Sequence, residues 1–307
     1  SSHAKTVQLP HTLRAEPAPC PCETKFCQFI KEARPDGLHF FAVCPDVHES
    51  KQKGRLMTSD SDAHGVHDYQ EDPRNADILI SVNGELKKRN DAVVSVFDSG
   101  YILGDGVWEG LRVKDGGIAF LPDHLKRLYA GAKTIDMDIG LTPDELTTRL
   151  FDCLKANDMS DGVHIRLMVT RGVKKTPYQG PRFTIGKATV VIIPEYKMPV
   201  PDVIDRGQSL FTVHVRRTGP AEQDQKLNSH SKLNCILACI QADKAGADEA
   251  LMLDPDGFVA TCNSTHFFIV RDGEVWTSPP EYCLGGITRA NILKACRNAG
   301  IPAIEKR

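Results

Sequence analysis

The chain contains 307 residues, of which 41% are apolar and 25% charged, so it is long enough to bury a core and has the composition of a globular protein. Lys and Arg total 38 against 40 for Asp and Glu, and this formal charge of −2 excludes the basic surface that binds nucleic acid nonspecifically. No segment approaches the ~20 apolar residues of a membrane span, and the first residues lack the apolar centre of a secretory signal. We therefore expect a cytoplasmic protein with no membrane and no nucleic-acid partner.

The ten cysteines are predicted to be reduced thiols, because a long chain without a secretory signal does not need a disulfide framework. Cys20, Cys22, Cys27 and Cys44 lie near one another in the sequence, but they lack the paired C-x2-C spacing of zinc sites. We therefore predict no metal site.

The first quarter of the chain differs from the rest. Residues 1–75 are rich in His, Pro and charged side chains and show little periodicity, apart from a possible short strand at Leu38–Val43. We predict that this segment is an N-terminal extension, partly disordered, which precedes a small α+β domain over residues 76–198 and a larger cofactor-binding domain over residues 199–307.

The small domain combines short strands with two amphipathic helices. Asn83-Gly84 predicts a tight hairpin turn, and Thr142 followed by Pro143 is typical of the start of a helix. The predicted strands are Ile78–Val82, Glu85–Lys88, Ile118–Phe120, Val163–Thr170 and Lys187–Pro194, and the predicted helices are Leu121–Lys133 and Thr142–Ala156.

The larger domain is predicted to contain a helix from Ser231 to Ala245 that ends at Gly246. Its apolar residues recur at helical spacing, so we expect a buried stripe of Leu233, Ile236, Leu237 and Ile240. Strands are expected at Leu210–Arg216, Glu249–Asp254, Phe258–Ala260 and Phe267–Arg271, and a last helix is expected at Gly285–Ala299.

Two glycines lead into this last helix in the run Leu284-Gly285-Gly286-Ile287-Thr288. The free N–H groups and the positive end of the dipole at a helix start bind anions, and glycines let a phosphate approach the backbone. The same pattern also occurs in ordinary strand-to-helix turns, so these residues alone leave both interpretations open.

Motifs in a fixed order over residues 76–307 resemble the fold-type-IV pyridoxal-phosphate enzymes. This family includes branched-chain and D-amino-acid aminotransferases, R-selective amine transaminases and aminodeoxychorismate lyase. The matching segments are Asp98, Gly104–Arg112, His124–Leu128, His164–Leu167, Thr170–Gly172, Ala245–Asp254, Gly257–Val259 and Leu284–Arg289. The resemblance implies a two-domain α+β fold with a cofactor cleft between the domains, pyridoxal 5′-phosphate as cofactor, and a homodimer.

The resemblance also assigns roles to residues that bind the cofactor. Arg127 resembles the arginine that holds the cofactor phosphate, and Gly286, Ile287 and Thr288 resemble the loop whose backbone and hydroxyl groups bind it. Leu284 resembles the residue packed on the pyridine ring. These assignments agree with the anion site that the glycine pattern predicts.

Three departures from the family pattern concern the chemistry. The position of the Schiff-base lysine aligns with Asn228, so Lys232, or else Lys226, is the candidate for the catalytic role. The glutamate that pairs with the pyridine nitrogen aligns with Thr261, which removes a carboxylate that would keep this nitrogen protonated. The relatives also continue beyond the place of Arg307 with a strand and a Gly-Thr loop, so the resemblance implies that the larger domain is truncated here.

The resemblance therefore implies a class IV aminotransferase, similar to branched-chain aminotransferases, that exchanges an amino group between an amino acid or amine and a 2-oxo acid. Two alternatives remain open. One is a non-catalytic family member that binds the cofactor, or a related anion, without a lysine bond. The other is a pyridoxal-phosphate-dependent lyase of the same fold.

Overall fold

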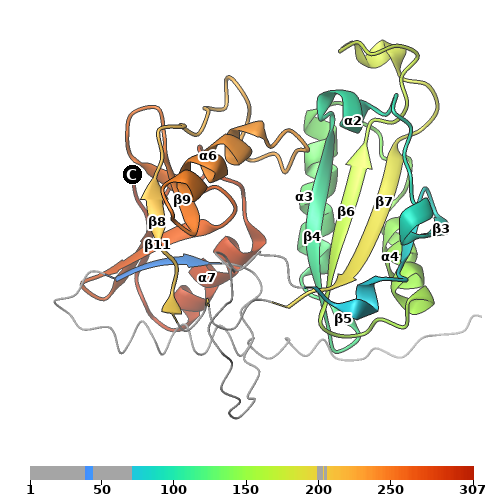
Figure 1. Cartoon of the computed structure of the whole chain (residues 1–307). Coiled ribbons are helices and arrows are strands. Elements are labelled where there is room, and N and C mark those ends of the chain that lie inside the picture. The colour runs from blue at the N-terminus through green and yellow to red at the C-terminus, as the bar shows by residue number, and fades with distance from the viewer. Residues whose placement is uncertain (1–38, 44–70, 199–202, 204–205) are drawn as a thin grey trace, which may run out of the picture.

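Figure 1 shows the computed structural model, which describes residues 39–43, 71–198, 203 and 206–307. Most of the predicted N-terminal extension, including Cys20, Cys22, Cys27 and Cys44, lies outside the described residues. The strand predicted at Leu38–Val43 is confirmed as β1 (His39–Val43). Among the described residues, no helix is long and apolar enough to cross a membrane.

The small domain contains a six-stranded antiparallel sheet with the order β3-β2-β7-β6-β4-β5. At its centre β6 pairs with β4, from Gly106 opposite Thr170 to Val113 opposite Val163, and with β7 over the same residues of β6. Figure 1 shows α3 (Leu121–Thr134) and α4 (Pro143–Ala156) on one face of this sheet. The strands are β2 (Leu79–Val82), β3 (Glu85–Lys88), β4 (Gly106–Lys114), β5 (Gly117–Ile118), β6 (Val163–Thr170) and β7 (Thr189–Tyr196).

Local signals in the sequence predicted most of this domain. Asn83 and Gly84 both have positive φ, as the predicted hairpin turn requires, and Thr142 caps α4 in a reciprocal pair with Glu145. The prediction was wrong at Phe120, which has a φ of 52° and precedes α3 instead of ending a strand. The long strand β4 was not predicted, because glycines interrupt its apolar residues.

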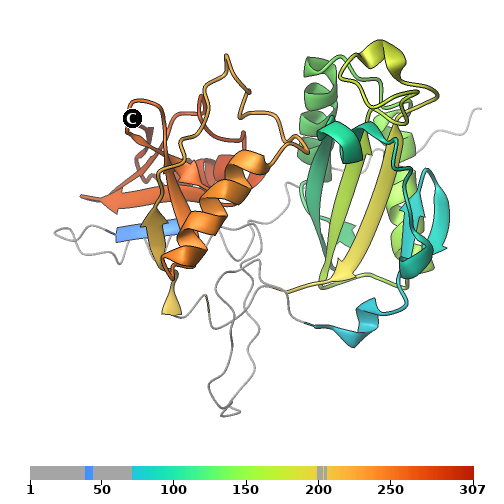
Figure 2. The ribbon, with the colours of Figure 1, turned by 45° about the horizontal axis from the view of Figure 1, so that its top comes forward.

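The second predicted domain, which keeps the name larger domain although residues 199–307 are fewer than residues 76–198, is built on two sheets. A three-stranded sheet has the order β10-β9-β8, and a four-stranded sheet has the order β1-β11-β12-β13, in which β1 pairs antiparallel with β11. Figure 2 shows α6 (Leu233–Lys244) lying along the first of these sheets. The remaining elements are α2 (Ser99–Leu103) in the small domain, and β8 (Leu210–Thr212), β9 (Glu249–Leu253), β10 (Val259–Cys262), β11 (His266–Arg271), β12 (Glu274–Thr277), β13 (Ala303–Glu305) and α7 (Ile287–Asn298) in the larger one.

The expected burial of α6 was wrong. Its predicted stripe faces outward, because the exposed fractions of Leu233, Ile236, Leu237 and Ile240 are 67%, 52%, 45% and 42%. The helix instead buries the small residues Ala238 and Ala242 against β8 and β9. The helix therefore has a second apolar face that the sequence analysis did not identify, and the closer approach that alanine permits favours packing of this face on the sheet.

Candidate active site

A buried carboxylate organises the centre of the site. Glu109 lies on β4 with a fully buried side chain, and Arg127 on α3 donates Nε–H to its Oε1 at 2.8 Å and Nη2–H to its Oε2 at 2.6 Å. His124 Nδ1, one turn earlier on α3, lies 2.7 Å from the same Oε2. Two residues at helical spacing i and i+3 therefore hold one carboxylate, and the bidentate pair fixes the direction of the guanidinium.

Arg127 also reaches the loop before α7, because its Nη1–H donates to the carbonyl oxygen of Gly285 at 2.9 Å. The next residue, Gly286, is the N-cap of α7 and provides no side-chain cap. The first N–H groups of the helix, at Ile287 and Thr288, have no acceptor within the helix. The structure thus brings the predicted arginine and the predicted anion loop together.

The two glycines of this loop have different surroundings. A Cβ placed on Gly285 would meet nothing within 4 Å, so the loop borders open space there. A Cβ on Gly286 would lie 2.7 Å from Cδ2 of His266 and closer still to its Nε2. Gly285 therefore leaves room for a ligand, whereas residue 286 must be a glycine because the imidazole of His266 occupies the space of a side chain.

Asn228, at the position expected for the lysine, is tied to β4. Its Nδ2 donates to the carbonyl oxygen of Trp108 at 2.7 Å, and the N–H of Trp108 donates to the carbonyl oxygen of Asn228 at 2.9 Å. The side chain is buried, and its Oδ1 has no hydrogen-bond partner among the described residues. An unpaired buried acceptor is costly, so this oxygen is available for a donor from a ligand.

Of the two candidate lysines, only Lys232 lies in the site. It is the N-cap residue of α6, and its ammonium group lies 5.5 Å from the centre of the Trp108 ring, on which Arg166 also stacks at 3.9 Å. Burial, together with the positive charges of Arg217, Arg127 and Arg166, lowers the pKa of Lys232. Lys226, by contrast, is exposed.

Thr261, at the position expected for the glutamate, is buried and donates its hydroxyl to the carbonyl oxygen of Thr265 at 2.9 Å. The loop between them is held by Glu249, a buried carboxylate of β9. Glu249 accepts the N–H and hydroxyl groups of both Ser264 and Thr265 at 2.7–3.1 Å. This loop is therefore fixed by the protein itself, and Thr261 presents no charge to a ligand.

Sequence reasoning missed several residues of this cluster. Glu109 received no role, although a glutamate among alternating buried residues of a strand is a signal of a buried ion pair. Arg217 is buried and donates Nη1–H to Cys235 Sγ at 3.0 Å, and no local pattern around it predicted that position. His266 likewise came close to the anion loop only through the tertiary fold.

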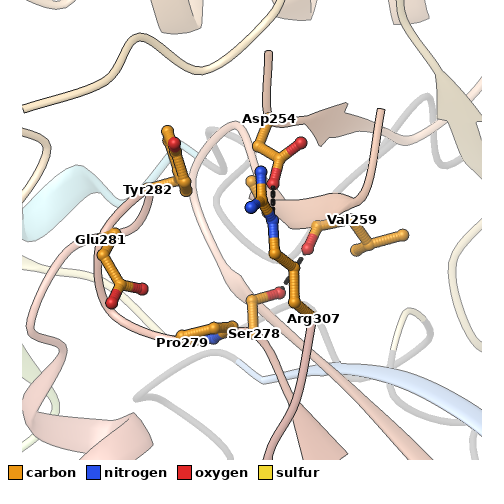
Figure 3. Close-up of a pocket in the computed structure, with 8 residues that line it drawn as sticks. Asp254, Val259, Ser278, Pro279, Glu281, Tyr282 and Arg307 are labelled. Atoms are coloured by element: carbon orange, nitrogen blue, oxygen red, sulfur yellow. Dashed lines mark hydrogen bonds and ion pairs between the residues drawn. The ribbon is translucent and has the colours of Figure 1, made fainter. Parts of the chain in front are cut away.

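A cavity of about 290 Å³ lies elsewhere in the larger domain, between Asp254, Val259, Ser278, Tyr282 and Arg307 (Figure 3). Figure 3 shows Arg307 extended toward Asp254, to which its Nε–H donates at 2.9 Å. The lining contains none of the predicted site residues. We therefore place the candidate active site at the Arg127 cluster and the N-terminus of α7.

Comparisons with known proteins identify the family of this chain. Residues 106–307 match the family model of class IV aminotransferases, and the chain belongs to this family. It is 42% identical over 222 residues to branched-chain-amino-acid aminotransferase-like protein 2 of Arabidopsis thaliana, a match that covers 72% of this chain and 40% of the relative. It is 31% identical over 239 residues to a branched-chain-amino-acid aminotransferase of Pseudomonas aeruginosa, which covers 75% and 76%.

Solved structures confirm the expected fold-type-IV architecture. The branched-chain aminotransferase from Thermoproteus uzoniensis with norvaline superimposes with a TM-score of 0.68 at 28% identity, covering 75% of this chain and 78% of that one. A second branched-chain amino acid aminotransferase, complexed with N-(5′-phosphopyridoxyl)-L-glutamate, gives a TM-score of 0.67 at 28% identity, covering 75% and 76%. The chain spans only 40% of the length of the Arabidopsis relative.

Proposed function

We propose that this chain forms the catalytic part of a pyridoxal-phosphate-dependent aminotransferase, which exchanges an amino group between an amino acid or amine and a 2-oxo acid. One observation carries the proposal. Arg127 contacts Gly285 directly before the N-terminus of α7, at a position where a Cβ would meet no atom within 4 Å, and Lys232, the candidate lysine near Trp108 and Arg166, has a lowered pKa.

The residues present fit the phosphate of the cofactor. Arg127 would bind it as a charge-assisted donor, and the backbone of Ile287 and the hydroxyl of Thr288 would complete the cup. Leu284 is partly buried beside this loop and would pack on the ring. Glu109 neutralises part of the charge of Arg127 and holds its fork in place, so the site is preorganised before a ligand arrives.

At the other end of the site, Lys232 rather than Asn228 is the residue that would react with the aldehyde of the cofactor. When bound, pyridoxal phosphate supplies an electron sink for the amino-acid carbon. A lowered pKa increases the fraction of neutral, nucleophilic amine at Lys232 near neutral pH, so this amine can bond to an aldehyde and accept or return a proton. Asn228 contributes the unpaired Oδ1 as an acceptor, and Arg166 stacks on the Trp108 ring.

The decisive experiment is reduction with borohydride after incubation with pyridoxal phosphate, followed by peptide mapping. We expect an absorbance band near 410–430 nm, the generic range of this chromophore, and a reduced adduct on Lys232. Lys232→Ala should abolish both, whereas the exposed Lys226→Ala is the matched control and should retain both. Asn228→Lys tests whether the family position can still react.

A chain that binds pyridoxal phosphate without any adduct, but gains one as Asn228→Lys, would be a binding protein and not a transferase. This second candidate is favoured by one observation, namely that Asn228 and Thr261 both lack the reactive groups of the family.

We also propose that the protein is a homodimer and cytoplasmic. Leu233, Ile236, Leu237 and Ile240 form an exposed face on α6, which we call the α6 apolar face, and an exposed apolar helix face is typical of an interface. Sedimentation of Leu237→Asp against the parent chain tests this assignment. No disulfide joins the six cysteines that the structure describes, which supports a reducing compartment.

A further inference from the structure

His266 occupies a position that the assigned roles leave unexplained. It is the first residue of β11 and directly follows the loop that Glu249 holds. The N–H of Thr265 donates to Glu249, and the carbonyl of Thr265 accepts the hydroxyl of Thr261. The backbone before His266 is therefore fixed from two sides, so the direction of its ring is set by the fold.

The imidazole packs directly on the anion loop. Its ring atoms fill the space where a side chain of Gly286 would stand, at the N-cap of α7. Arg127 contacts the preceding residue, Gly285, through its carbonyl oxygen. The guanidinium and the imidazole thus touch consecutive residues of one loop.

The surroundings of this ring are strongly positive. Burial is the largest cause that lowers the pKa of His266 to about 3, and the positive charges of Arg289 on α7, Arg127 on α3 and Arg217 lower it further. The ring is therefore neutral at physiological pH and carries one N–H donor and one free lone pair.

The ring has no hydrogen-bond partner within the described part of the chain, and the residue is partly exposed to solvent. A donor at a helix N-terminus, in the positive field of three guanidinium groups, is complemented by an anion. A neutral donor binds that anion without adding a further positive charge to a crowded site, which an arginine in its place would do.

We propose that His266 is a binding residue of the anion site, whose neutral imidazole donates a hydrogen bond to the phosphate held by Arg127 and the N-terminus of α7. The proposal rests on the proposed function in so far as the phosphate belongs to pyridoxal phosphate. The anion chemistry itself does not depend on any lysine.

The test therefore uses inorganic phosphate as well as pyridoxal phosphate, with binding measured by calorimetry. We expect His266→Phe, which keeps the ring shape and loses the donor, to weaken binding of both by about 10-fold or more, the range of a hydrogen bond to a charged group. Binding of pyridoxal, which lacks the phosphate, should be unchanged. The exposed His214→Phe is the matched control and should bind all three like the parent.

Gly286→Ala tests the contact between ring and loop. Its Cβ would displace the imidazole, so we expect a loss of phosphate affinity similar to that of His266→Phe. The two changes should be far from additive when combined, because both remove the same donor. Additive losses would show that Gly286 acts on the anion by a route that excludes His266.

A measurement on the unaltered chain covers the case in which these variants fail to fold. In ¹⁵N NMR of the histidine rings at pH 5, we expect one ring that remains neutral and whose donor nitrogen shifts when phosphate is added. If no neutral ring responds, or if His266→Phe binds phosphate like the parent while Arg127→Ala does not, His266 is not part of the site. A phosphate response without any lysine adduct would instead keep this inference and overturn the transferase.

Discussion

The two ends of the candidate site differ in how the protein satisfies their polar groups. We call the end around Arg127, which we propose binds the phosphate, the phosphate end; there Arg127 is held by Glu109 and by the carbonyl of Gly285. We call the end around Lys232, the proposed reactive amine, the amine end; there Asn228 keeps an unpaired buried Oδ1, and Lys232 has a lowered pKa. The fold thus fixes the groups that would bind the phosphate, whereas the chemistry would depend on single side chains, which can change within the same fold.

The largest expected effect is at the phosphate end, in Glu109→Ala. This change leaves the guanidinium of Arg127 without its buried carboxylate, so we expect the free energy of unfolding to fall by about 3–5 kcal/mol. Urea unfolding measures it. Glu85→Ala, which breaks the solvent-exposed pair with Lys87, is the matched control and should leave the free energy of unfolding almost unchanged. Equal losses in both variants would contradict the view that Glu109 organises the site.

The next effect concerns ligand affinity at the same end. Arg127→Ala should weaken binding of pyridoxal phosphate by about 1.5–3 kcal/mol, because a charge-assisted hydrogen bond is lost. Arg127→Lys should restore little of it, since a lysine cannot reproduce the fork that contacts Glu109 and Gly285 together. Fluorescence titration gives the dissociation constants, and Arg171→Ala should leave them unchanged. An unaltered constant in Arg127→Ala would remove Arg127 from the site.

The amine end should show itself in the pH dependence of stability. Burial lowers the pKa of Lys232 in the folded chain below its ordinary value of 10.5. At pH values between the lowered pKa and 10.5, the unfolded chain therefore binds more protons than the folded one. Stability must then rise with pH across this interval, and the cost of the charged amine is fully present below it. Lys232→Met should therefore stabilise the chain at pH 7, and the gain should shrink as the pH approaches 10.5.

Urea unfolding of Lys232→Met and the parent at several pH values measures this difference. The exposed Lys226→Met is the matched control, for which no pH-dependent gain is expected. A gain for Lys232→Met that stays constant from pH 7 up to the ordinary lysine value of 10.5 would mean that this amine is not buried in the site.

The same contrast explains what the sequence could predict. The helix start after Gly285 and Gly286 was predictable from local signals, and its proximity to Arg127 followed from the family motif, whereas anion binding there stays a prediction. Glu109 and His266 contact residues on other elements, Arg127 and Gly286, so a local pattern could indicate burial at Glu109 but could not name either partner.

The prediction of which face of α6 is buried was wrong for a related reason. Leu237 and Ala238 are neighbours on one helix, and both lie on faces that are apolar in the sequence. Only the shape of the sheet formed by β8 and β9 selects the alanine face for burial, and this shape arises from strands outside the helix. Amphipathic periodicity therefore predicted the helix but not the direction in which it packs.

The smallest expected effect on the free energy of unfolding is that of Asn228→Ala, at the amine end. Asn228→Ala removes the bond from Nδ2 to the carbonyl of Trp108, which costs stability, but it also removes the unpaired Oδ1, whose burial was unfavourable. These two terms oppose each other, so we expect a net loss of about 1 kcal/mol or less in the free energy of unfolding.

Asn157→Ala is the matched control, because both ends of that amide are paired. Its Oδ1 accepts the N–H of Leu79 at 2.7 Å, and its Nδ2 donates to the carbonyls of Leu79 and Cys153 at 2.9 and 2.8 Å. Removing it leaves backbone groups without partners, so we expect a loss of about 2–3 kcal/mol in the same urea experiment. If the two variants lose equal stability, Oδ1 of Asn228 is satisfied within the folded chain, and the amine end is then as fully built as the phosphate end.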